Sequence, residues 1–114
     1  MARADRLERM EAQREEAEAD YRGALVAALR VTAAGQWGLF DHQQDRHARA
    51  KAAPMLAELE ELAEVVNGLR ERLGMEEFAL HAEFMAQRGP VKSDAVGEPK
   101  KAAAWLARLG EAAR

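Results

Sequence analysis

Apolar side chains recur in alternating steps of three and four residues along two long stretches of this chain, as on one face of a helix. Over residues 55–73 the alternation has no exception, and the row consists of Met55, Leu59, Leu62, Val66, Leu69 and Leu73. Residue types that favour strands are scarce, since Ile is absent and Thr occurs once, at Thr32. We therefore predict an all-α fold, a small bundle of four to five helices with a long N-terminal helix.

The other stretch predicts that long helix over residues 2–34, which contain no proline and one glycine, Gly23. Its apolar row is Leu7, Met10, Ala17, Tyr21, Ala24, Ala28 and Val31, and Arg14 is the charged residue that interrupts it. Such a helix is about 45–50 Å long, which exceeds the width of a small bundle. Because 114 residues is the usual size of one domain, we predict a single helical domain, 1–114, from which residues 1–20 could project.

Glycine, proline and aspartate mark the predicted ends of the helices. Gly35 should close the first helix, and Asp41 or Asp45 could cap the second. Pro54 is either the first-turn residue of a new helix or a kink in a longer one, and we favour a kink or short break. Gly74 should stop the helix that carries the unbroken apolar row.

Two further helices are predicted, one from Met75 to Arg88 and a last one that begins at Pro99. Within the preceding helix, the pair Asn67-Gly68 costs about 1 kcal/mol of helix propensity relative to alanine. A close approach by the backbone of another helix would explain that pair.

Charge and cysteine content restrict the function classes. The 17 basic and 20 acidic residues give a net charge of −3, so no large field of one sign attracts or repels nucleic acid. The chain has no cysteine, which excludes disulfides, thiolate metal sites and a cysteine nucleophile. We find neither the apolar core of a signal peptide nor a run of about 18 apolar residues, and we expect a cytoplasmic protein.

A loop rich in large apolar residues follows the first helix. Trp37, Leu39 and Phe40 lie beside Gly35 and Gly38, and leaving them in water would cost about 25 cal/mol per Å² of apolar surface. We favour a loop that folds back under the bundle. The alternative is an exposed docking surface.

The first half of the long helix offers the strongest indication of function. Its apolar row over residues 7–21 is narrow, and an isolated helix is marginal in water, so a partner surface would stabilise it. The simplest partner is a second copy of the chain, although a different protein or packing within one bundle would also serve. We therefore predict a non-enzymatic helical interaction or assembly module that forms a homodimer. The candidate partner-binding residues are Leu7, Met10, Ala17, Tyr21, Trp37 and Phe40.

Two alternatives rest on charged residues. The first is a regulator that binds nucleic acid or another anion through Arg46, Arg49 and Lys51, although such a short run is more often a solvated helix face. The second is a metal protein or enzyme that uses imidazole and carboxylate ligands. Its candidates are His42, His47 and His81 with Asp41, Asp45 and Glu77. Their spacing is poor for a metal site, and the simpler interpretation of His81 is a boundary residue bonded to Glu77 or to solvent. No catalytic residue and no cofactor is predicted.

Overall fold

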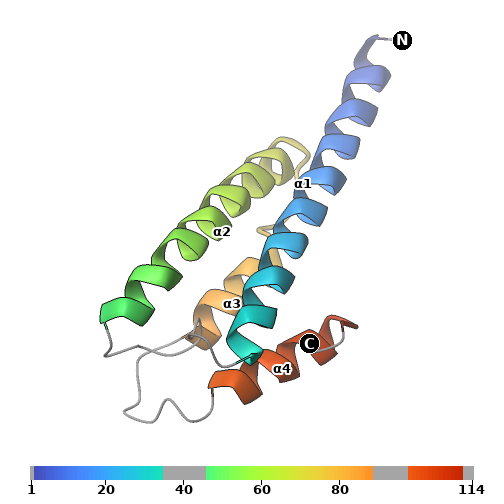
Figure 1. Ribbon diagram of the computed structural model, residues 1–114. Coiled ribbons are helices and arrows are strands. Elements are labelled where there is room, and N and C mark those ends of the chain that lie inside the picture. The colour runs from blue at the N-terminus through green and yellow to red at the C-terminus, as the bar shows by residue number, and fades with distance from the viewer. Residues whose placement is uncertain (1, 35–45, 89–97, 112–114) are drawn as a thin grey trace.

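The computed structural model describes residues 2–34, 46–88 and 98–111, and in these residues it has four helices and no strand (Figure 1). Helix α1 is Ala2–Ala33, α2 is Arg46–Arg72, α3 is Ala79–Arg88 and α4 is Glu98–Arg108. The predicted all-α fold and the long N-terminal helix are confirmed. Side chains are described for 4–34, 54–87 and 101–111, so the predicted loop with Trp37 and Phe40 lies outside the described residues.

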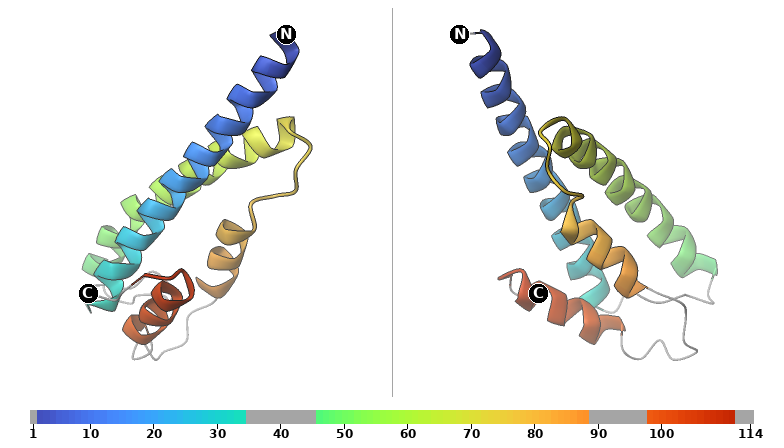
Figure 2. Two further views of the ribbon diagram at one scale, coloured as in Figure 1. Left: turned by 90° about the vertical axis from the view of Figure 1, so that its right-hand side faces the viewer. Right: turned by 180° about the vertical axis from the view of Figure 1, so that it is seen from behind.

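Helices α1 and α2 run side by side in opposite directions, and α4 crosses the C-terminal end of α1 (Figures 1 and 2). The N-terminal turns of α1 extend beyond the C-terminal end of α2, and none of the other three described helices lies beside them. The molecule measures 56 × 25 × 20 Å. With 32 residues, α1 is about 48 Å long, so this one helix accounts for most of the long dimension.

The core surrounds the C-terminal half of α1. Its fully buried large side chains come from α1, α2, α3 and α4: they are Tyr21, Leu25, Leu29, Leu59, Val66, Phe84 and Leu106. The buried hydroxyl of Thr32 donates to the carbonyl of Ala28 at 2.9 Å, so this polar group is satisfied within its own helix. Of the unbroken apolar row in α2, Leu59 and Val66 are buried, whereas Leu62 and Leu69 are partly buried. The row therefore covers both the centre of the core and its edge.

Aromatic contacts join α3 to α4. The rings of Phe84 and Trp105 meet edge to face with centroids 6.1 Å apart, and the Trp105 indole N–H donates to Gln87 Oε1 at 2.9 Å. Arg108 lies 4.7 Å from the Trp105 ring centroid and pairs with Glu83. An edge-to-face pair and a cation over a ring are both favourable geometries, so the short α4 is fixed by specific contacts as well as by burial.

The predicted stop at Gly74 is confirmed. Gly74 has φ +71°, its N–H donates to Glu71 O at 3.0 Å, and the Met75 N–H donates to Arg70 O at 2.8 Å. This pair of bonds is the Schellman motif, which satisfies the last carbonyls of a helix. The predicted start of the next helix at Met75 is wrong. Helix α3 begins at Ala79, and residues 75–78 form a non-helical link.

Side chains of α2 hold that link in place. Asn67 Oδ1 accepts a hydrogen bond from the Phe78 N–H at 2.8 Å, and Arg70 Nε donates to Glu76 O at 2.6 Å. A Cβ added to Gly68 would meet no atom within 4 Å, so the close helix approach expected there is wrong. Asn67 instead serves as a hydrogen-bond acceptor for backbone that has left the helical path.

At Pro54, α2 continues as one helix, so Pro54 lies inside a longer helix and does not begin a new one, and the short break is absent. Proline has no N–H for the carbonyl four residues earlier, so one hydrogen bond of the helix is missing at this point. Pro54 itself is exposed.

Candidate interaction surface

A cluster of charged side chains divides α1 into two parts. Arg14, the residue that interrupts the apolar row, donates to Glu11 at 2.6 Å and to Glu18 at 2.8 Å. Glu18 also accepts from Arg70 of α2 at 2.8 Å, which links the two helices. The side chain of Arg14 is only 13% exposed, and its charge within the apolar row is balanced by the carboxylates of Glu11 and Glu18.

The pKa values of the cluster agree with stable ion pairing. The hydrogen bonds to Glu11 and then Glu18 raise the pKa of Arg14 above its ordinary value. Partial burial raises the pKa of Glu18, but the hydrogen bonds from Arg14 and Arg70 outweigh it, and the pKa lies below its ordinary value. Arg14 and Glu18 therefore stay charged at neutral pH.

On the N-terminal side of this cluster, α1 is largely uncovered. Residues 4–9 are all exposed, Leu7 is 50% exposed and Met10 is partly buried. On the other side, Ala17 is 8% exposed and Tyr21 is completely buried in the core of the same chain. Of the predicted partner-binding residues that the structure describes, only Leu7 and Met10 therefore keep apolar surface available to another molecule.

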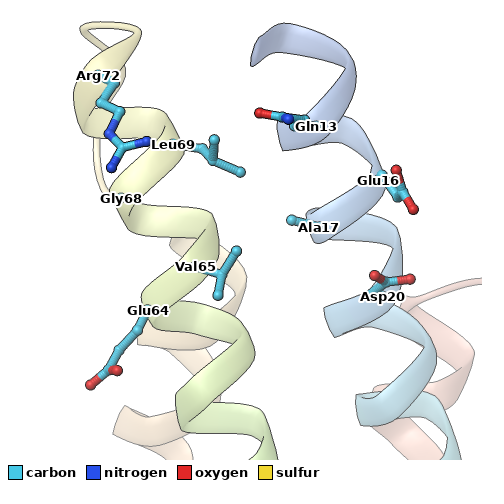
Figure 3. Close-up of a pocket in the computed structure, with 9 residues that line it drawn as sticks. All are labelled: Gln13, Glu16, Ala17, Asp20, Glu64, Val65, Gly68, Leu69 and Arg72. Carbon is cyan, nitrogen blue, oxygen red and sulfur yellow. The ribbon is translucent and has the colours of Figure 1, made fainter. Parts of the chain in front are cut away.

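A groove runs between α1 and α2 beside the cluster (Figure 3). Gln13 and Ala17 on α1 point toward Val65 and Leu69 on α2, and Gly68 leaves the space between them open. The groove has a volume of about 490 Å³. Its remaining lining residues are charged: Glu16, Asp20, Glu64 and Arg72. An apolar floor with a mostly acidic rim is thus present along both helices.

The described part of the chain leaves three large apolar side chains exposed, namely Leu7, Val65 at 56% and Met75 at 37%. Val65 lies in the groove opposite Ala17, and Met75 follows Gly74 at the C-terminal end of α2. Leu7 belongs to the N-terminal turns of α1, and these turns extend past the C-terminal end of α2 (Figure 2). Exposed apolar surface is therefore concentrated at one end of the α1–α2 pair rather than scattered.

His81 has a partner that the sequence did not indicate. Its Nδ1 lies 2.6 Å from the hydroxyl oxygen of Tyr21, and the two rings meet edge to face, so the expected bond to Glu77 is replaced by one to α1. Burial lowers the pKa of His81, and the carboxylates of Glu60 and Glu77 only partly oppose that effect. Burial also raises the pKa of Tyr21. Both rings are neutral at physiological pH, which suits a structural contact.

The residues of the two charged alternatives lie largely outside the described side chains. Arg46, Arg49, Lys51 and His47 belong to α2, but their side chains are not among those described, and Asp41, His42 and Asp45 precede that helix. Within the described part of the chain, no group of three histidine or acidic side chains is arranged to hold a metal ion. Likewise, no helix traced there combines the length and apolar character needed to cross a bilayer.

No protein-family model, curated protein or solved structure matches this chain. The surface is therefore interpreted from its own residues. Sequence reasoning identified Leu7 and Met10 but missed Val65 and the groove around it. The available signal was the Val65-Val66 pair, in which only Val66 belongs to the apolar row, so that Val65 must face another side of α2.

Proposed function

We propose that this protein is a helical assembly module that self-associates through the N-terminal turns of α1. The observation that carries the proposal is the concentration of Leu7, Val65 and Met75 at one end of the α1–α2 pair. A solvated helix end has no need of large apolar side chains, and large apolar side chains left exposed among charges are typical of a protein interface.

The helix itself supports the same proposal. Helix α1 continues for about three turns on the N-terminal side of Arg14, and the first turns of the helix have no other described helix beside them (Figure 2). Leu7 and Met10 extend the row of Ala17 and Tyr21, which is buried further along α1. Because an isolated helix of this length is marginal in water, a partner that covered these residues would stabilise the uncovered turns.

Sedimentation velocity over a wide range of protein concentrations tests the proposal. We expect a dimer at high concentration and a reversible shift to monomer on dilution. The variant Leu7→Lys with Met10→Lys should weaken the dimer at least tenfold, because it replaces the apolar side chains of the uncovered turns with charges. Its thermal stability as a dilute monomer should change little.

Ala104→Lys provides a matched control, since Ala104 is an exposed helical residue of α4, away from the α1 N-terminus. This variant should dimerise like the wild type. A wild-type chain that remains monomeric at every concentration would refute self-association. Equal weakening by the control would show that added positive charge alone accounts for the effect.

A further inference from the structure

One face of α1 carries an ordered pattern of charge. Arg6, Arg9, Gln13, Glu16 and Asp20 follow one another in steps of three and four residues, so they lie along a single stripe of the helix, here called the charge stripe. All five side chains are exposed. The stripe is basic before Gln13 and acidic after it.

These charges are not consumed by ion pairs within the chain. Among the described residues, Arg6, Glu16 and Asp20 have no ion-pair partner, and Arg9 donates only to the backbone carbonyl of Asp5 at 3.4 Å. By contrast, Arg14 and Glu18, which face the body of the molecule, are paired. The charge stripe is therefore free to determine how another molecule aligns with α1.

We infer that the partner is a second copy of this chain, bound antiparallel through α1 with a two-fold axis at Gln13. This inference rests on the self-association proposed above and adds its orientation and register; of the two apolar residues on the uncovered turns it places Met10 in the contact, whereas Leu7 lies on another face of α1. Reversal about Gln13 brings Arg6 opposite Asp20 of the second copy and Arg9 beside Glu16 of the second copy. A two-fold axis repeats both pairs, so the basic half of each stripe meets the acidic half of the other.

The groove fits the same register. It extends along α1 from Gln13 to Asp20, about 10 Å, which equals the length of the segment from Arg6 to Gln13 that would lie against it. The acidic rim, which includes Glu64 of α2, would receive the basic segment, and the apolar floor at Val65 and Leu69 would receive Met10.

A parallel pair would not use this pattern. It would set Arg6 against Arg6 and Asp20 against Asp20, and like charges held close together destabilise a complex. In a parallel pair the uncovered turns of the two copies would also lie beside each other, so neither set of turns would enter the groove of the other copy. Charge and shape therefore both favour the antiparallel arrangement.

Charge reversal tests the pairing. The basic half is reversed by Arg6→Glu with Arg9→Glu, and the acidic half by Glu16→Lys with Asp20→Lys. Each variant alone should dimerise at least tenfold more weakly than wild type, and an equimolar mixture should recover wild-type affinity as a heterodimer. Glu8→Lys, an exposed substitution off the stripe, is the control and should have little effect. Variants that each keep wild-type affinity would overturn the inference.

Engineered disulfides test the orientation, because the chain has no cysteine of its own. Under mild oxidation Gln13→Cys should cross-link to itself. Arg6→Cys and Asp20→Cys should each stay uncross-linked alone and cross-link when mixed. Self-cross-linking of Arg6→Cys would establish a parallel pair and overturn the register while leaving self-association intact. A wild-type monomer in sedimentation would instead remove the proposed function, which separates the two failures.

Discussion

The two halves of α1 continue one apolar row at helical spacing, but they differ in composition and surroundings, because charged residues are frequent up to Asp20 and rare after it. From Tyr21 to Val31 the apolar row is buried or partly buried against other helices, whereas from Ala4 to Arg9 every side chain is exposed. The change occurs at Arg14, where the ion pairs with Glu11 and Glu18 neutralise a charge on the inner face. A continuous helical row therefore predicts a helix, but what covers that helix depends on how far its neighbours extend.

The largest expected difference between the halves concerns one matched pair of leucines. Leu25 is completely buried and Leu7 is 50% exposed, and both belong to α1. Leu25→Ala should lower the free energy of unfolding by about 2–5 kcal/mol, because it leaves a cavity in the core. Leu7→Ala should cost less than about 1 kcal/mol in dilute protein. Urea denaturation measures both, and equal losses would mean that the halves do not differ as described.

A smaller loss of stability is expected from the ion pairs that separate the two halves of α1. Arg70 is 16% exposed and bonds both Glu18 and the carbonyl of Glu76. Arg70→Ala should therefore cost about 1–3 kcal/mol of unfolding free energy, because the partly buried carboxylate of Glu18 loses one of its two partners and the carbonyl of Glu76 loses its donor. Arg72→Ala, two residues further on and exposed, is the control and should be nearly neutral. A double-mutant cycle of Arg70→Ala with Glu18→Gln should show coupling.

Local rules predicted much of the fold. The apolar rows predicted α1 and α2, and Gly74 predicted the end of α2, because helix periodicity and left-handed backbone are properties of a few adjacent residues. Phe78 marks the limit of this reasoning. It continues the helical pattern in sequence, yet its N–H bonds to Asn67 of another segment, so the helix begins only after it. A contact between elements overrode the local preference.

The candidate surface was only half predictable for the same reason. Leu7 and Met10 could be identified because the apolar row continues through them, but the sequence does not tell where α2 ends relative to α1. That relation is fixed by the bond between Glu18 and Arg70, which are far apart in the chain. Tyr21 shows the opposite error, because it was predicted to bind a partner and is completely buried. It lies on the same row as Leu7, and its bond to His81 places it inside the molecule.

The part of α1 from Tyr21 onward, here called the embedded half, contacts a histidine of α3 that should make stability depend on pH near neutrality. Burial holds the pKa of His81 below that of an unfolded chain, so the unfolded state binds a proton first as the pH falls. The resulting stability is complete above about pH 6.5, the ordinary pKa of histidine, and declines as the pH falls toward the folded value. His81→Gln should reduce the loss of stability between about pH 7.5 and about pH 5.5. An imidazole titration by NMR with a pKa at or above the ordinary value would contradict this.

The smallest expected change in stability distinguishes the covered face of α1 from its exposed face. Gly23 lies in the embedded half, yet a Cβ added there would meet no atom within 4 Å, and it continues the spacing of the charge stripe after Asp20. Gly23→Ala should stabilise the dilute monomer by about 0.5–1 kcal/mol, because alanine favours the helix.

Gly110→Ala is the control with the opposite sign, because Gly110 has φ +79° and any side chain is strained there, at a cost of about 1–2 kcal/mol. Thermal unfolding of both variants at low concentration measures the difference. If Gly23→Ala destabilised the monomer, another part of the same chain would have to cover this face. The charge stripe would then be unavailable to a second copy along the embedded half, and only the projecting turns could mediate assembly.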